Sequence, residues 1–261
     1  MKKILRKNID KAFSLIGYKI INDIELQKLL IDQEYANELK FILSFEPKNL
    51  NKYFEVRTLS KSQLRQDLFV LNELDFKNNG YFVEFGGCNG ILHSNTYLLE
   101  KEFNWKGIIA EPGKIWHSEL KSNRNAFIEK KCIWSETNQE VEFNEPEIAS
   151  LSTIQGFGEN DNHTELRKIG KKYSVKTISL NDLLRKYNAP NIIDYLSIDT
   201  EGSELEILKN FEFEEYKFKI ITVEHNYTGI RDSIYELLTK KGYKRVKEDY
   251  SEFDDWYVLQ S

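Results

Sequence analysis

Short apolar runs alternate with helical segments after about residue 60, and this order restricts the fold more than any other feature of the sequence. Tyr81–Phe85 and Gly107–Glu111 have the length and composition of buried strands. A segment of helical pattern, 94–102, connects them. Successive strand–helix units place their strands parallel in one sheet, because the helix returns the chain to the edge where it started. The sequence therefore predicts an α/β fold with a doubly wound, mostly parallel sheet.

The alternation continues to the end of the sequence with one interruption. Segment 136–175 contains short strand-like pieces around Gly156 and Gly158 and many polar residues, so we interpret it as a surface insertion. The last two strand candidates, 244–247 and 256–259, predict an antiparallel hairpin at one sheet edge. The other predicted helices are 63–74, 179–187, 203–210 and 232–241, and the other predicted strands begin at Phe127 or cover 193–198 and 219–223.

Residues 1–58 are predicted to form a helical arm that precedes the main domain, residues 59–261. Apolar residues recur there at roughly helical spacing until Pro47 ends the pattern. Two interpretations stay open: the arm pads the main domain, or it covers the active site or forms the contact of a homodimer. The recurring apolar residues are Phe13, Ile16, Ile20, Ile24, Leu30 and Leu39.

Composition and charge exclude several classes of protein. The net charge of −5 offers no general attraction to phosphate backbones, so nucleic acid is not an expected partner. No run of 18 or so apolar residues occurs, and no small-residue cleavage site follows the lysines at the amino terminus. Cys88 and Cys132 lack the paired spacing of a zinc or redox motif. We therefore expect a cytoplasmic protein without a transmembrane segment.

The loop after the first predicted strand is rich in glycine. Ligands of open α/β sheets bind at the carboxyl ends of the strands, where this loop lies. Cys88 and Ile91 occupy the positions of the second and third glycines of the dinucleotide fingerprint G-x-G-x-x-G, which disfavours a dinucleotide enzyme. The pattern acid-x-G-x-x-x-G fits instead, as Glu84, Gly86 and Gly90. A purely structural turn is the alternative interpretation of this loop.

Glu111 ends the second predicted strand, 27 residues after Glu84. An acidic side chain at this place can accept hydrogen bonds from both hydroxyls of an adenosine ribose. Two neighbouring loops then indicate one nucleoside-like ligand. The alternative is that Glu111 is an ordinary solvated surface residue.

Acidic residues and a histidine follow the fourth and fifth predicted strands. Asp199, Glu224 and His225 offer the mixed oxygen and nitrogen ligands that suit Mg²⁺, Mn²⁺ or Fe²⁺. We therefore predict a divalent-metal site formed by these three residues. Glu201 and Glu204 have a second interpretation, because acids at the start of a helix are stabilised by its dipole. We adopt that interpretation for Glu204 only.

Taken together, these motifs resemble the FkbM family of S-adenosylmethionine-dependent methyltransferases over roughly residues 60–245. Segment 194–204 (Asp-Tyr-Leu-Ser-Ile-Asp-Thr-Glu-Gly-Ser-Glu) is the most specific of them. The sequence departs from the usual family pattern at 85–88, where a small or aliphatic residue followed by Gly, Ala and Asn is more frequent. The other matching segments are 62–68, 82–90 with 94–96, 105–107 leading to 111–112, and 223–226.

The resemblance implies a Rossmann-like class I methyltransferase fold, with S-adenosylmethionine over Gly86 and its ribose on Glu111. It also implies acceptors that are commonly sugar or polyketide hydroxyls. The arm and the insertion lie outside the resemblance, so the acceptor stays open. The residues that the resemblance assigns to the cofactor are Gln63, Glu84, Gly86, Gly87, Asn89, Gly90, Ser94, Asn95, Thr96, Glu111 and Pro112.

The predicted reaction is O-methylation of a sugar hydroxyl, on a nucleotide-linked sugar or a glycan of bacterial capsule or O-antigen biosynthesis. In this hypothesis the metal held by Asp199, Glu224 and His225 lowers the pKa of the hydroxyl, and Glu201 takes its proton. Two alternatives stay open: a metal-dependent hydrolase, and a sugar-binding module without activity. The basic residues Arg167, Lys168, Lys171 and Lys172 can meet a diphosphate or form an ordinary solvated face.

Overall fold

The structure is a computed structural model that describes residues 28, 35–158 and 163–260. The chain divides into two compact units, one up to Phe45 and one from Glu46 onward. In the first unit residues 35–43 are helical, and most of the predicted arm lies outside the described residues. No helix in the described ranges has the length and apolarity needed to cross a membrane.

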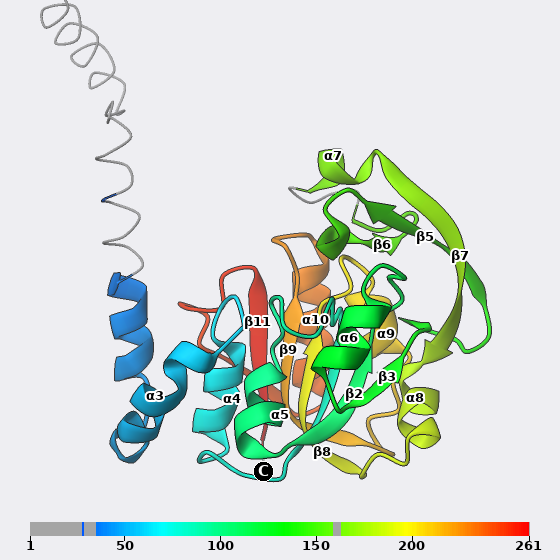
Figure 1. Ribbon diagram of the computed structural model, residues 1–261. Helices are drawn as coiled ribbons and strands as arrows, with labels where there is room; N and C mark the ends of the chain where they lie inside the picture. Colours follow the sequence, from blue (N-terminus) through cyan, green and yellow to red (C-terminus); the bar gives the residue numbers. More distant parts are fainter. Residues whose placement is uncertain (1–27, 29–34, 159–162, 261) are drawn as a thin grey trace, which may run out of the picture. The chain divides into compact units, whose positions relative to one another are not determined.

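The central sheet of the second unit consists of β1 (Tyr81–Phe85), β2 (Lys106–Ala110), β3 (Phe127–Glu129), β8 (Ile192–Ile198), β9 (Lys217–Glu224), β10 (Tyr243–Val246) and β11 (Asp254–Leu259) (Figure 1). Their order is β10-β11-β9-β8-β1-β2-β3. All neighbours from β9 to β3 pair in parallel. The doubly wound, mostly parallel sheet predicted from the sequence is confirmed.

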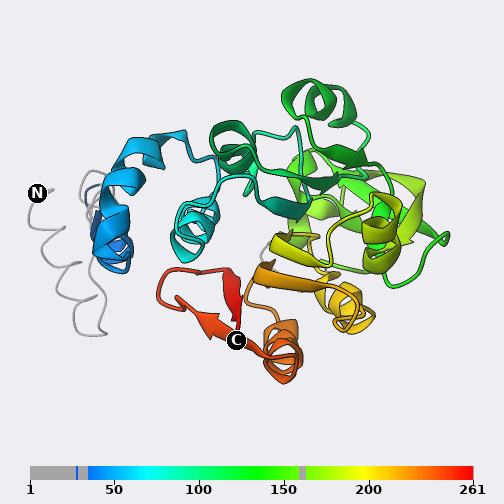
Figure 2. The ribbon, with the colours of Figure 1, turned by 90° about the horizontal axis from the view of Figure 1, so that it is seen from below.

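The carboxy-terminal hairpin completes one edge of this sheet. β11 pairs antiparallel with both β10 and β9, so β11 lies inside the sheet and β10 at its edge. Figure 2 shows β10 and β11 beside α10 (Ile230–Lys240). The register places Asp254 opposite Glu224, which brings a carboxyl group from the last strand to the end of β9.

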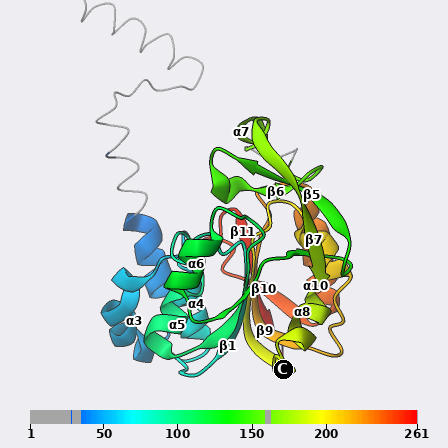
Figure 3. The same ribbon diagram turned by 45° about the vertical axis from the view of Figure 1, so that its right-hand side comes forward.

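Helices cover both faces of the central sheet (Figure 3). α4 (Gln66–Glu73), α5 (Tyr97–Phe103) and α6 (His117–Asn123) lie on one face, and α8 (Leu180–Lys186), α9 (Glu204–Lys209) and α10 on the other. Strand residues such as Val83, Leu196 and Ile221 are fully buried between these layers. Burial on both faces explains the continuous apolar runs. Before α4 the chain forms η1 (Pro47–Asn49), α3 (Leu50–Val56) and η2 (Arg57–Leu59).

The predicted insertion is a second, four-stranded sheet. It contains β4 (Cys132–Trp134), β5 (Glu140–Pro146), η3 (Ala149–Leu151), β6 (Thr153–Ile154), α7 (Thr164–Arg167) and β7 (Gly170–Ser179), with strand order β4-β7-β5-β6. This insertion sheet is more regular than the short pieces expected between residues 136 and 175, and it extends beyond both limits. The pattern was hard to detect because only three of the ten residues of β7 are buried and the core of the insertion, which includes Phe143 and Val175, is small.

Candidate active site

The glycine-rich loop after β1 passes very close to the loop after β8. Gly86 has φ +76°, and a Cβ atom there would lie 2.2 Å from the carbonyl oxygen of Asp199. A Cβ atom on Gly87 would lie 2.2 Å from Cγ2 of Ile109. Only glycine fits at position 86, for its conformation as well as its space. The loop therefore leaves its backbone open to a ligand at the carboxyl end of β1.

Several predicted cofactor residues form a buried network beneath this loop. The carboxylate of Glu84 accepts hydrogen bonds from Ser94 Oγ (3.0 Å), the Asn95 backbone N–H (2.7 Å) and Thr96 Oγ1 (2.6 Å). Arg124 also donates to Thr96 and to Glu84. Buried carboxylates require such partners. In the structure, these four predicted cofactor residues bind one another and fix the shape of the loop.

Asn89 and Gln63 have different surroundings. The side-chain oxygen of Asn89 accepts from the backbone N–H groups of Ile91 and Leu92, which closes the turn that contains Gly90. Gln63 lines the main cavity. Next to it, Ser62 donates to the buried carboxyl of Asp67 at 2.6 Å, which anchors the segment that carries Gln63.

Glu111, directly after β2, is buried at the wall of the main cavity. Its carboxylate accepts from the backbone N–H of Cys88 (2.8 Å) and of Gly113 (2.6 Å). Burial raises its pKa to about 7. The solvated alternative for Glu111 does not hold, because the residue is only 5% exposed. The loops after β1 and β2 are thus joined through one carboxyl group.

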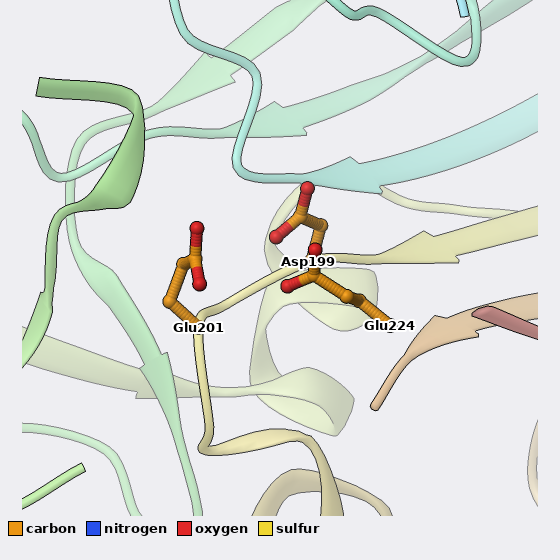
Figure 4. Close-up of side chains that lie close together, drawn as sticks. All are labelled: Asp199, Glu201 and Glu224. Carbon is orange, nitrogen blue, oxygen red and sulfur yellow. The ribbon is translucent and has the colours of Figure 1, made fainter. Parts of the chain in front are cut away.

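Three acidic side chains meet after β8 and β9 (Figure 4). Each of Asp199, Glu201 and Glu224 places a carboxylate oxygen within 4.8 Å of the others. Burial, and then the charge of Asp199, raise the pKa of Glu224 well above its usual value. Burial raises the pKa of Asp199 to about 6. Glu224 therefore retains a proton to higher pH than a solvated glutamate does, and its carboxyl group lies against that of Asp199.

Glu201 is held by the insertion sheet. Arg167 of α7 donates to Glu201 Oε2 from a buried guanidinium, and Thr153 Oγ1 donates to the Glu201 carbonyl at 2.8 Å. Asn226 Nδ2 donates to the same carboxylate at 3.3 Å. These contacts hold Glu201 at φ +58°, a conformation that non-glycine residues rarely adopt. The insertion thereby fixes the orientation of a carboxylate in the central domain.

His225 lies apart from this group. Its Nδ1 accepts from the Tyr227 backbone N–H at 3.0 Å, and its Nε2 lies 3.7 Å from Asp255 Oδ1. Burial lowers its pKa, so the ring is neutral with its proton on Nε2. Within the described ranges, the group able to hold a metal contains Glu201 as its third member and not His225. The structure brings together Asp199 and Glu224 of the predicted metal site.

One cavity of about 350 Å³ connects these features. Of the predicted site residues, it is lined by Gln63, Gly86, Glu111, Pro112, Asp199, Glu201 and Glu224. Sequence reasoning did not select its other residues, which include Cys88, His93, Cys132, Phe143, Ser150, Leu151, Ile154, Asn226 and Phe253. The insertion residues among them carry no charge or motif. The sequence feature that could have indicated them is their position between strands, at the carboxyl edge of the sheet.

Comparisons with known proteins agree with this arrangement. Residues 84–245 match the family described as "Methyltransferase FkbM domain". Methyltransferase sdnD of Sordaria araneosa is 25% identical over 227 residues, which cover 75% of this chain and 87% of that protein.

Solved structures with some likeness include two methyltransferases. The precorrin-6y C5,15-methyltransferase of Geobacter metallireducens is 10% identical, with a TM-score of 0.42, and the match covers 75% of this chain and 87% of that one. For the ribosomal protein L11 methylase of Lactobacillus delbrueckii the identity is 8%, the TM-score 0.36 and the coverage 75% and 76%. Because the family match spans more than half of the sequence and includes the loops after β1, β2, β8 and β9, this chain belongs to the FkbM family of S-adenosylmethionine-dependent methyltransferases.

Proposed function

We propose that the protein is an O-methyltransferase that transfers the methyl group of S-adenosylmethionine to a hydroxyl group of a sugar. The acceptor is a nucleotide-linked sugar or a glycan, of the kind used to build bacterial capsules and O-antigens. The assignment to capsule or O-antigen biosynthesis is based on the family resemblance. The choice of a hydroxyl follows from the acidic side chains in the cavity.

The observation that carries the proposal is that two chemically different groups line one cavity. Glu111 and the backbone around Gly86 form one group, and Asp199, Glu201 and Glu224 form the other. A volume of about 350 Å³ falls in the range of small-molecule sites. The absence of a side chain at Gly86 and the buried carboxyl of Glu111 fit an adenosine group. Glu111 would hold the ribose, and the backbone at Gly86 the rest of the cofactor.

The three acidic side chains supply what an alcohol acceptor needs. When bound, S-adenosylmethionine would supply an electrophilic methyl group. The protein must orient the hydroxyl and remove its proton, and general-base help is typically worth about 10²–10⁴ in rate. Glu201 has a cationic partner in Arg167, whereas burial and the charge of Asp199 raise the pKa of Glu224 and favour its protonated form. Glu201 is therefore the base, and the Asp199–Glu224 pair orients the acceptor through hydrogen bonds.

A divalent cation is the second part of the proposal. Asp199 and Glu224 remain the predicted ligands, and Glu201 replaces His225 as the nearest third donor. One oxygen of Glu224, Oε2, is buried without a hydrogen-bond partner, which suits a ligand atom. The carboxylate oxygens favour Mg²⁺ or Mn²⁺. The cation would lower the pKa of a hydroxyl bound beside Glu201.

The test is release of S-adenosylhomocysteine from S-adenosylmethionine in the presence of a pool of nucleotide sugars. We expect release by the wild type, a loss of about 10²–10⁴ in turnover for Glu201→Gln, and unchanged cofactor affinity by calorimetry. Glu206→Gln, on the partly exposed side of α9, is the matched control and should behave as wild type. Full turnover by Glu201→Gln would exclude it as the base.

The same assay tests the metal. Release that stops with a chelator and returns with Mg²⁺ or Mn²⁺ supports the cation. Release that ignores the chelator removes the cation from the proposal and leaves the carboxylates as hydrogen-bonding groups. If no sugar gave release of S-adenosylhomocysteine, the proposed sugar acceptor would be contradicted. Binding of S-adenosylmethionine, measured separately by calorimetry, tests the cofactor site independently of the acceptor.

A further inference from the structure

The insertion sheet contains a second cavity whose described lining is basic. This insertion pocket has a volume of about 340 Å³ and lies among β5, β6, β7 and the segment around α7. Its charged lining residues are Arg167, Lys168 and Lys172, and its polar ones include Gln155 and Thr164. No carboxylate is found among the described residues that line it. In a chain of net charge −5, such a concentration of positive charge is local.

We propose that the insertion pocket binds a phosphate or diphosphate group of the methyl acceptor. The identification of the anion with the acceptor rests on the proposed function, whereas anion binding by the pocket does not. Phosphate oxygens are strong acceptors for Lys and Arg, and a concave site with cations on its wall favours a compact anion. Lys168 and Lys172 would contact the anion, and Arg167 would contribute its charge.

Arg167 connects this pocket to the active site. Its guanidinium lines the insertion pocket and donates to Glu201 Oε2 in the main cavity. Thr153 makes the same connection, because it lines the pocket and donates to the Glu201 carbonyl at 2.8 Å. The pocket therefore lies about one side-chain length from the acidic group. In a sugar phosphate the ring hydroxyls lie a few bonds from the phosphate, so an acceptor anchored in the pocket would present a hydroxyl beside Glu201.

The present partners of the two lysines are easily displaced. Lys168 pairs with Glu165 and Lys172 with Glu142, and the side chains of these glutamates are 78% and 53% exposed. Exposed ion pairs contribute little to stability and are screened by salt. A multiply charged phosphate contacting both lysines would compete successfully with two separate, solvated carboxylates.

The chain offers a matched control on the same strand. Lys171 and Lys172 are consecutive residues of β7, so their side chains lie on opposite faces of the sheet. Lys171 is opposite Glu145 in the register, and it does not appear among the residues described as lining the pocket. Lys171→Glu changes the net charge in the same way as Lys172→Glu, at the neighbouring position.

The experiment is calorimetric titration of the full chain with inorganic pyrophosphate at low salt. We expect binding by the wild type, a loss of at least about tenfold in affinity for Lys172→Glu and a larger loss for Lys168→Glu/Lys172→Glu, and a change below about threefold for Lys171→Glu, which matches Lys172→Glu in charge. The pyrophosphate affinity of the milder Lys168→Gln/Lys172→Gln variant should lie between that of the wild type and that of Lys168→Glu/Lys172→Glu. Circular dichroism and S-adenosylmethionine affinity verify that each variant is folded.

Absence of pyrophosphate binding to the wild type would overturn the proposal. So would an equal loss in Lys171→Glu, because the effect would then be one of general charge. The source of the anion is distinguished by titration with UDP-glucose, glucose 1-phosphate and glucose. Tighter binding of UDP-glucose indicates a nucleotide diphosphate, and tighter binding of glucose 1-phosphate indicates a sugar phosphate. Glucose, which has no phosphate, should not bind. Pyrophosphate binding without methylation of any sugar would refute the proposed function and leave the pocket as an anion site.

Discussion

Gly86 is the position where one added methyl group would disturb the contact between the loops after β1 and β8. In Gly86→Ala the new Cβ atom would lie 2.2 Å from the Asp199 carbonyl oxygen, and this atom belongs to the backbone and cannot rotate away. The substitution also places an L-residue at φ +76°, which costs about 1–2 kcal/mol. Forcing the two loops apart adds a cost of about 1–3 kcal/mol. We expect the free energy of unfolding to fall by about 2–5 kcal/mol.

Gly156 provides the control for this prediction. It has φ +93° and nothing within 4 Å of an added Cβ atom, so Gly156→Ala has the conformational cost without the clash. Urea unfolding of both variants should therefore differ by the clash alone, about 1–3 kcal/mol. If the cofactor requires the loop in its native position, Gly86→Ala should also weaken S-adenosylmethionine binding by about tenfold to a hundredfold in calorimetry.

The reasoning would be refuted by a Gly86→Ala variant that binds the cofactor as the wild type does and is no less stable than Gly156→Ala. In that case the loops after β1 and β8 can separate without cost. The close approach at Gly86 would then have no bearing on cofactor binding.

Two further predictions concern buried charges. Arg167→Met leaves the Glu201 carboxylate without its buried cation, so the free energy of unfolding should fall by about 3–5 kcal/mol. Turnover in the S-adenosylhomocysteine release assay should also drop, with little change in cofactor affinity. Arg167→Lys should recover part of both the stability and the turnover. Burial raises the pKa of Asp254 to about 7, so the folded protein retains a proton that the unfolded chain loses near pH 4. The stability associated with this bound proton is present at pH 4 and is lost as the pH rises through 7. The free energy of unfolding, measured in urea, should therefore decrease between pH 5 and 8, and the decrease should be smaller in Asp254→Asn. An equal decrease in both proteins would mean that Asp254 does not hold a proton.

The central sheet was predictable because its strands are buried on both faces. Such strands are nearly continuous apolar runs, and Phe82, Val83 and Phe85 are all buried. The insertion sheet was not predictable in the same detail. β7 is ten residues long, but it begins with Gly170 and two consecutive lysines, so the polar and apolar alternation in the sequence covers only a short part of the strand, residues 172–176.

The grouping of Asp199 with Glu224 was predicted because the carboxyl ends of neighbouring parallel strands meet at one edge. His225 was grouped with them because it is next to Glu224 in the sequence. Successive side chains at the end of a strand lie on opposite faces, however, and His225 contacts Tyr227 and Asp255 instead. Proximity in sequence and proximity in space differ most at such positions.

The sequence does not show whether polar residues near the end of a strand contact a ligand or one another. The side chains of Glu84 and Thr96 have the chemistry of ligand contacts, yet in the structure they hydrogen bond to each other and to Arg124. Arg124 follows α6 and lies far from them in the sequence, so no local pattern reveals this partner. The network is a consequence of tertiary packing.

The wall of the cavity comes from two parts of the chain that can change independently. The loops after β1, β2, β8 and β9 belong to the central sheet, whereas Phe143, Leu151 and Ile154 come from the insertion. The insertion leaves the sheet after β3 and returns at α8, so a homologous segment could be exchanged there without touching the glycine-rich loop. A chimera made in this way should keep its methyl donor and acquire a new acceptor. Arg167 and Glu201 would have to be retained or replaced together, because their ion pair joins the exchanged part to the rest.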